Sequence, residues 1–283
     1  MSLQPYDADL RDRYLRHLGL SDGLGPPSPE ALRALQHAHL DRVPYENLEI
    51  QLGRPTSIDP RESAQRIVTG RGGYCFHLNG AFAALLVSLG YDVVLTRGAV
   101  PSAGDGTAWG NHLVPLVRLA ERTWLVDVGL GDGFRDPFPL EPADLPQPPF
   151  HYRLEHVAGT LWRFHHDALA SITGFDLDVS PVALTAFAAK HEELSTSPES
   201  PFVQKLVVQL RRADHALTLR GCVLTRVDAT GKASRDVLKQ DEWLDLLRDE
   251  FGLRLDDVDS DQLTALWYRV RAAHEAWERA GRP

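Results

Sequence analysis

The sequence predicts an α+β protein in which helices come first, antiparallel strands follow, and strands and helices mix at the end. Two changes of apolar spacing support this order. Apolar residues recur at helical spacing up to about Leu89, whereas after Gly90 they alternate with polar residues in segments rich in Val, Leu and Thr. Helical spacing returns near the end, with Leu263, Leu266 and Val270 on one face. At 283 residues the chain exceeds the usual single domain, so we expect two or three substructures.

Helices are predicted through most of the first 89 residues. Ser28 and Pro29 have the residue types of an N-cap and a first helical position, and Glu30 adds an acid to the first turn. The chain should leave this helix before Pro44, because proline disfavours helical geometry in the preceding residue. The expected helices cover about 7–18, 28–42, 60–69 and 75–89, the last one amphipathic.

Strands are predicted in the middle of the chain and again before its end. Residues 136–149 contain six prolines, so we expect an irregular crossing there. Residues 181–191 indicate a helix, and 195–201 a loop. The expected strands are 91–100, 111–119, 123–128, 152–157, 160–165, 203–210, 216–219 and 222–227, and the expected last helices are 241–250 and 261–279.

Composition and charge exclude several classes of protein. A net charge of −9 argues against binding nucleic acid or an anionic membrane through a general positive field. No run of 18 apolar residues could span a membrane, and the first residues lack an apolar signal core. We expect a cytoplasmic protein with reduced thiols. Cys75 and Cys222 match no zinc-ligand spacing, and no metal site is predicted. The sequence does not indicate an oligomeric state.

Cys75 is the candidate nucleophile. It follows Gly72 and Gly73 and opens the helix predicted after them, so it should lie at a helix N-terminus. Unpaired N–H groups and the positive end of the helix dipole favour a thiolate there. The glycine pair allows a sharp turn and close approach to the sulfur. A buried structural cysteine is the competing interpretation.

His112 and Asp127 are the candidate base and its orienting carboxylate. Each is a polar residue in an apolar strand, and a short turn joins the two strands. If the turn centres between Leu119 and Ala120, His112 and Asp127 lie directly opposite each other on one face. A carboxylate there would fix the imidazole tautomer, and the imidazole could take a thiol proton. A register slip of one residue would separate them, leaving a core histidine and a turn-capping aspartate.

With these residues in place, the sequence resembles the arylamine N-acetyltransferase family. The family signature around its nucleophile, RGGxCFELN, occurs here as RGGYCFHLN from Arg71 to Asn79. Further matches, in family order, are Tyr14–Gly19, Val43–Leu48, the His112 strand, Val126–Gly131 and Ser195–Phe202. The resemblance implies an N-terminal helical bundle (1–90), a central antiparallel β-barrel (91–190) and a C-terminal α/β lid (191–283), with a catalytic core like that of cysteine proteases.

The resemblance also implies an activity and a set of site residues. Acetyl would pass from acetyl-CoA to Cys75 in a ping-pong reaction, with His112 as base and Asp127 orienting it. The acceptor would be an arylamine, arylhydroxylamine or arylhydrazine. No permanently bound cofactor is implied. By position, the acceptor contacts would be Tyr45, Val100, Leu130 and Gly131, and the CoA contacts Pro101, Ser102, Gly129 and Gly131.

Two residues depart from the family pattern. His77 replaces the usual glutamate two residues after the cysteine, which could raise the positive charge near the thiolate. Leu130 stands where the family usually has phenylalanine, so the acceptor site could be roomier. Three other functions compete: an ansamycin-type amide synthase, a papain- or transglutaminase-like hydrolase, and an inactive binding protein. Cys222 is assigned to the core.

Overall fold

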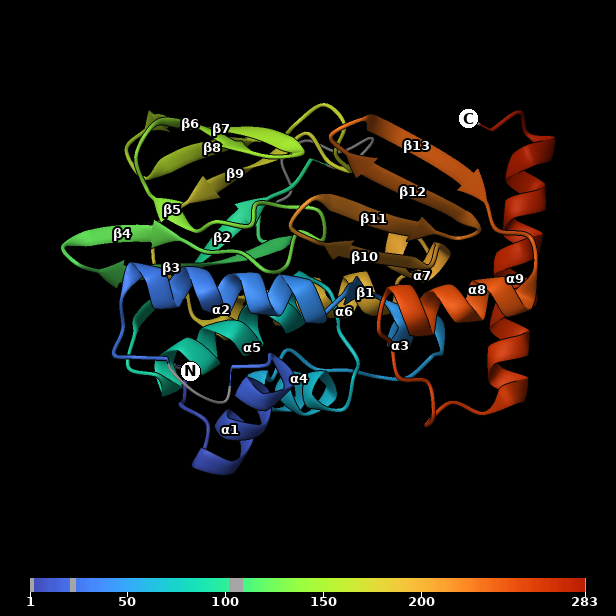
Figure 1. The fold of residues 1–283 in the computed structure, drawn as a ribbon, viewed down its shortest axis with the longest axis horizontal. Coiled ribbons are helices and arrows are strands. Elements are labelled where there is room, and N and C mark those ends of the chain that lie inside the picture. Colours follow the sequence, from blue (N-terminus) through green and yellow to red (C-terminus); the bar gives the residue numbers. More distant parts are fainter. Residues whose placement is uncertain (1–2, 21–23, 102–108, 283) are drawn as a thin grey trace.

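The computed structural model describes residues 3–20, 24–101 and 109–282. An N-terminal group of helices lies below two β-sheets, one of eight strands and one of five, and the last helix closes one end (Figure 1). The predicted mixture of helices and antiparallel strands is confirmed. The division into a bundle, a barrel and a lid remains a prediction.

The helices begin and end at the residues that the capping signals favour. Asp7, Ser28 and Asp59 each cap a helix by accepting from a backbone N–H, and Pro29 and Pro60 occupy first positions. The helices are α1 (Ala8–His17), α2 (Pro29–Arg42), α3 (Leu48–Gln51), α4 (Pro60–Val68), α5 (Cys75–Ser88), α6 (Ala188–Thr196), α7 (Pro201–Gln204), α8 (Gln240–Asp245) and α9 (Ser260–Arg279), with a 3₁₀ turn at Leu184–Phe187 and a π-helical turn at Leu246–Glu250.

The eight-stranded sheet is curled, and every neighbouring pair of its strands is antiparallel. Its order is β5-β4-β3-β2-β9-β8-β7-β6, and within the described residues β5 and β6 do not pair, so the sheet is open there. The strands are β2 (Asp92–Ala99), β3 (His112–Leu119), β4 (Arg122–Leu125), β5 (Phe138–Pro139), β6 (Ala143–Gln147), β7 (Phe150–Ala158), β8 (Leu161–His165) and β9 (Gly174–Asp178).

The five-stranded sheet pairs one strand from the N-terminal part of the chain with four strands from its last third. Its order is β1-β10-β11-β12-β13, and β1, from the N-terminal part, pairs with β10 through Tyr45 and Gln209. One face packs its apolar side chains against α8 and α9, with Trp243 and Trp267 in contact. The strands are β1 (Tyr45–Glu46), β10 (Val207–Arg211), β11 (His215–Arg220), β12 (Val223–Asp228) and β13 (Gly231–Asp236).

Several predicted elements are wrong in their bounds or character. The segment 136–149 is not wholly irregular, because it contains β5 and β6; Pro146 is tolerated because β6 is an edge strand. Residues 201–204 form α7 instead of loop and strand, and β13 was not predicted. The helix after Cys75 is not amphipathic, since all of its residues from Cys75 to Leu86 are buried. Among the described residues, no helix combines the length and the apolar character that crossing a membrane requires.

Candidate active site

Cys75 is the first residue of α5, as predicted. The preceding residue, Tyr74, is extended and makes no side-chain cap, so no capping side chain occupies the N–H groups of the first turn, which begins at the cysteine. The Cys75 side chain is nearly buried, with 4% of the residue exposed, and its Sγ lies 3.6 Å from the carbonyl oxygen of Asn111. The sulfur therefore faces the start of β3.

The glycine pair before Cys75 is held by β1. Glu46 accepts a hydrogen bond from the Gly72 N–H at 3.0 Å, and its own N–H donates to the carbonyl of Gly73 at 2.9 Å. A β-carbon on Gly72 would collide with the carbonyl oxygen of Pro44. Gly72 thus serves the close packing of this loop on the chain at 44–46.

His112 and Asp127 meet in a buried hydrogen bond, with His112 Nε2 2.6 Å from Asp127 Oδ2. The predicted register is wrong by two residues, since the turn lies at Ala120 and Glu121 and Leu119 pairs with Arg122. A shift of two preserves the face of every side chain. His112 and Asp127 are therefore diagonal neighbours on one face, and Asp127 lies just beyond the end of β4.

Asn79 links the nucleophile helix to this pair. It lies one helical turn after Cys75, and its amide donates to Asp127 Oδ1 at 2.8 Å and to the Leu113 carbonyl at 2.7 Å. Its oxygen accepts from the Val128 N–H at 2.9 Å. The Gly129 N–H also donates to Asp127 Oδ1, at 2.7 Å. Three hydrogen bonds therefore fix the Asp127 carboxylate from α5, β3 and its own loop.

The protonation of His112 follows from its partners. Burial alone would lower the pKa of His112, but the Asp127 charge, its hydrogen bond and the hydrogen bond to the Cys75 side chain outweigh burial and raise it to about 10. The imidazole is therefore protonated at neutral pH and lies between a carboxylate and a sulfur. The ring edge of Phe175, 5.3 Å away between centroids, covers His112.

His77 lies on the other side of the first turn of α5. Only 3% of it is exposed, and neither ring nitrogen has a hydrogen-bond partner among the described residues. Its ring packs edge-on against Tyr74 and His191, at 4.6 and 5.4 Å. Burial, then the Arg66 charge and His191, hold the pKa of His77 well below its usual value. The expectation that His77 adds positive charge near the thiolate is therefore wrong.

Two of the three predicted acceptor contacts, Tyr45 and Val100, lie near Cys75, and the third, Leu130, belongs to another cluster. Tyr45 packs against the apolar cluster that contains Cys75. Val100 exchanges two backbone hydrogen bonds with the Asn111 side chain, at 2.8 and 2.7 Å, next to the carbonyl that faces the sulfur. Leu130 is buried in the apolar cluster of the eight-stranded sheet. Their contact with an acceptor remains a prediction.

The predicted CoA contacts are more dispersed. A β-carbon on Gly129 would lie 2.8 Å from the Cys75 α-carbon, and one on Gly131 would collide with Gln209. Gly131 also has a positive φ of 76°. Close packing within the protein thus accounts for both glycines, which were predicted to leave room for CoA. Pro101 is exposed, and Ser102 lies outside the described residues.

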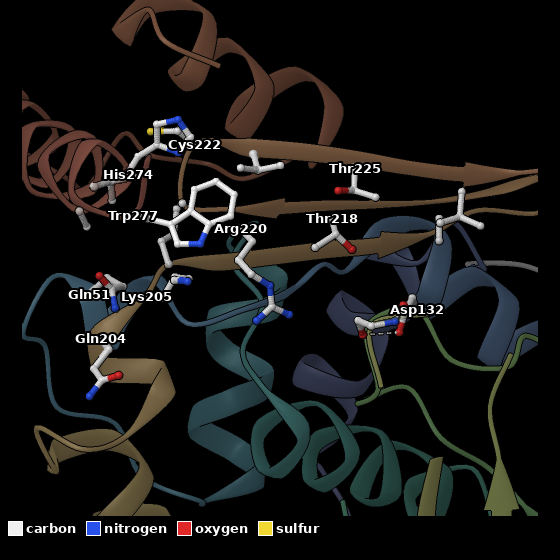
Figure 2. Close-up of a pocket in the computed structure, with 18 of the residues that line it drawn as sticks. Gln51, Asp132, Gln204, Lys205, Thr218, Arg220, Cys222, Thr225, His274 and Trp277 are labelled. Atoms are coloured by element: carbon white, nitrogen blue, oxygen red, sulfur yellow. Dashed lines mark hydrogen bonds between the residues drawn. The ribbon is translucent and has the colours of Figure 1, made fainter. Parts of the chain in front are cut away.

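A cavity of about 480 Å³ lies near these residues, but none of Cys75, His112 and Asp127 lines it. It is lined by alternate residues of β11 and β12 and by the C-terminal half of α9, and reaches the 129–132 loop at Asp132. Figure 2 shows Arg220 pointing into it, with Lys205 and Trp277 nearby and Asp132 at the other end. Four basic residues line it: Lys205, Arg220, Lys232 and Arg269. It is suited to an extended anionic ligand.

Sequence reasoning missed two polar residues that position the site, Gln36 and Asn79. The Gln36 oxygen accepts from the Asp127 N–H at 3.2 Å, from a helix almost a hundred residues earlier. No local pattern indicates this contact. Asn79 did carry a signal, since it lies four residues after Cys75 and so on the same helical face.

Comparison with known proteins finds similarity that extends over most of the chain. The family model described as "N-acetyltransferase" matches residues 29–260. The arylamine N-acetyltransferase / N-hydroxyarylamine O-acetyltransferase of Salmonella typhimurium is 32% identical over 271 residues, covering 92% of this chain and 94% of that protein. The proansamycin X synthase of Amycolatopsis mediterranei is 34% identical over 150 residues, covering 50% of this chain and 57% of that protein.

Solved structures agree in fold. The arylamine N-acetyltransferase of Mycobacterium marinum in complex with CoA superposes with a TM-score of 0.82 at 25% identity, covering 92% of this chain and 98% of that one. The arrangement of strands and helices around Cys75 is therefore shared with a protein that holds CoA.

Proposed function

The chain belongs to the arylamine N-acetyltransferase family, and we propose that it transfers an acetyl group from acetyl-CoA to an arylamine, arylhydroxylamine or arylhydrazine through an acetyl-Cys75 thioester. The observation that carries the proposal is the buried chain of contacts from Cys75 through His112 to Asp127, at the start of a buried helix. Such a chain can activate a thiol toward a carbonyl carbon.

In the first half-reaction, His112 and Cys75 act as an ion pair. With the His112 proton held by Asp127, the Cys75 sulfur attacks the carbonyl carbon of the acetyl thioester. The negative charge that develops on the carbonyl oxygen is stabilised by N–H groups at the start of α5, of which the Cys75 N–H is the nearest candidate. The bond from carbon to the CoA sulfur breaks, His112 gives its proton to that sulfur, and CoA leaves.

In the second half-reaction, the neutral His112 acts as base. The acceptor nitrogen or oxygen attacks the acetyl carbon while the His112 ring nitrogen that faces the sulfur takes the acceptor proton. Because Nε2 bonds Asp127 Oδ2, Nδ1 is the atom that faces Cys75. The bond from carbon to the Cys75 sulfur breaks, and the thiolate and imidazolium are restored.

We place the donor in the large cavity beside the site. Its basic lining contrasts with the net charge of −9, and within the described part of the chain Lys205, Arg220 and Lys232 are in no ion pair. Uncompensated cations that line a cavity attract phosphate groups. The anionic end of CoA would lie at Arg220, and its sulfur would point past Asp132 toward Cys75.

The acceptor would enter on the side of Tyr45, Val100 and Leu130. An aliphatic side chain at 130 provides apolar area without a ring to stack on, which favours acceptors that fill volume over those that need an aromatic partner. The amide synthase function remains an alternative, because one relative of that chemistry matches half of the chain. In that case the acyl group would be a long polyketide chain.

The decisive experiment is to incubate the protein with acetyl-CoA alone and measure its mass. We expect a gain of one acetyl group on Cys75, with release of one equivalent of CoA, and loss of that group on addition of an arylamine or arylhydrazine. The Cys75→Ala variant serves as the control and should not be acetylated. Acetylation in that variant, or acyl transfer only from a carrier-bound polyketide, would reject the acetyl-CoA proposal.

A further inference from the structure

A cluster of three metal-binding side chains lies at the end of the large cavity away from Asp132. His274 and Glu278 are one turn apart on α9, and Asp236 ends β13. Their ligand atoms all lie within 4.8 Å of one another. His274 Nε2 is 3.9 Å from Asp236 Oδ1 and 3.8 Å from Glu278 Oε1. Figure 2 shows the His274 ring at this end of the cavity, near Trp277.

The imidazole of His274 is the second observation that points to a ligand. The residue is 5% exposed, and its Nε2 is buried without a hydrogen-bond partner among the described residues. A buried polar atom that lacks a partner costs about 1–3 kcal/mol. This atom is nevertheless aimed between two carboxylates, at distances too long for hydrogen bonds. A group placed between the three would satisfy it.

The geometry fits a small transition-metal ion. Zinc binds imidazole nitrogen and carboxylate oxygen at about 2.0–2.2 Å, which places neighbouring ligand atoms roughly 3.4 Å apart in a tetrahedron. The His274 Nε2 distances to the two carboxylate oxygens, 3.9 and 3.8 Å, exceed that by about half an ångström, and the two carboxylates lie within 4.8 Å of each other. An imidazole ligand favours zinc and its neighbours over calcium or magnesium, which prefer oxygen ligands.

We propose that Asp236, His274 and Glu278 form a binding site for a divalent transition-metal ion, with water as the fourth ligand. Arg282 competes for this site. Its Nη2 lies 2.6 Å from Asp236 Oδ2 and 2.7 Å from Glu278 Oε1, so it neutralises the carboxylates when no metal is bound. Metal entry would displace Arg282, whose guanidinium also packs over Trp277 at 5.2 Å from the ring centroid.

Any test of this site must distinguish it from metal binding by the two cysteine thiols of the chain. Cys75 and His112 could themselves bind zinc, so titrations should use the full-length Cys75→Ala protein. Cys222 also lines the cavity, but burial raises the pKa of its thiol to about 11 and it is not among the clustered ligands. Cobalt serves as a probe, because a thiolate ligand gives an intense charge-transfer band and an imidazole–carboxylate site does not.

The test is a calorimetric zinc titration of metal-stripped Cys75→Ala protein. We expect one zinc ion per chain, no binding of magnesium, and a cobalt spectrum without a thiolate band. His274→Gln should weaken zinc binding more than 100-fold, and Asp236→Asn and Glu278→Gln at least tenfold each. His156→Gln, which changes an exposed histidine on β7, is the matched control and should leave the affinity unchanged.

Arg282→Gln gives a prediction of opposite sign. Removing the competing guanidinium should tighten zinc binding, and this readout does not depend on the folding of the His274 variant. Absence of zinc binding up to millimolar concentration would overturn the proposal. So would equal zinc affinity in the parent and His274→Gln proteins, or weaker binding after Arg282→Gln.

Discussion

The two sides of the first turn of α5 differ in how their polar groups are satisfied. On the side of Cys75 and Asn79, every polar atom of the Asp127 carboxylate is bonded, by His112, Asn79 and the Gly129 N–H. On the opposite side, His77 is equally buried but has no hydrogen bond on either nitrogen in the described structure. The same helix therefore carries a polar network with every hydrogen bond made and, two residues from Asn79, a buried polar residue with none.

This difference indicates where sequence change is tolerated. If one member of such a network is replaced, its partners become buried polar atoms without a hydrogen bond. Each such atom lowers the stability of the folded state. His77 has no such obligation, because its contacts with Tyr74 and His191 are between rings. The departure from the family glutamate at this position thus lies on the side that the proposed chemistry does not use.

Asp127→Asn should have the largest effect on the bonded side. The substitution keeps the size of the side chain but removes the charge that holds the His112 proton, so we expect acetyl transfer to fall about 10⁴-fold, as in other triads. Steady-state rates with acetyl-CoA and an arylamine measure the loss, and circular dichroism checks the fold. Rates near those of the parent protein would make Asp127 structural.

The pH dependence of stability tests the charge of His112. Because the folded pKa is raised from 6.5 to about 10, the stabilisation is complete below about pH 6.5 and is lost as the pH rises toward 10. The unfolding free energies of the parent and of His112→Gln, measured with denaturant, should therefore approach each other as the pH rises across this interval. A difference in unfolding free energy that stays constant from pH 6.5 to 10 would contradict the assigned charge.

Asn79→Ala should separate positioning from chemistry. It removes the two hydrogen bonds that the Asn79 amide donates to Asp127 and Leu113 and the one that its oxygen accepts from the Val128 N–H, so we expect about 2 kcal/mol of lost stability. Misplacement of His112 should lower kcat about 100-fold with little change in KM for acetyl-CoA. Asn47→Ala is the matched control: it removes a buried amide that bonds Phe202 and Lys205, and should reduce stability without lowering kcat.

His77→Phe should have the smallest effect, because it keeps a ring and removes two buried nitrogens that lack partners. We expect an unchanged or slightly increased stability, within about 1 kcal/mol, and kcat within about threefold. His191→Phe is the contrast, since it also removes the hydrogen bonds to Tyr74 and to the Thr56 carbonyl. Comparable losses in the two variants would mean that His77 is bonded after all.

The sequence predicts the site better than it predicts the strand register that builds it. Cys75 at a helix start and the pairing of His112 with Asp127 follow from local patterns and one turn. The turn was placed one residue early, which moved the register by two, and the alternation of a strand has a period of two. His112 and Asp127 therefore remained on one face. A slip of one would have lost the site.

Other features of the structure could not be predicted from local sequence patterns, for identifiable reasons. Strand β13 has an exposed, polar sequence around Ala233 and Ser234, and its position at a sheet edge requires no apolar face. The environment of His77 depends on His191, whose ring nitrogen bonds Tyr74 117 residues away. The large cavity is formed by β11, β12 and α9 together. None of these contacts has a signature within one segment.

Strand β1 has a consequence for how the protein is made. Glu46 holds the glycine loop before Cys75, while the adjoining Asn47 accepts from the Val207 N–H, 160 residues later. Closing so long a loop is entropically costly and comes late in folding. We therefore expect the nascent chain on the ribosome to carry an unactivated thiol, which becomes a nucleophile only after the last third of the protein has been synthesised and has docked.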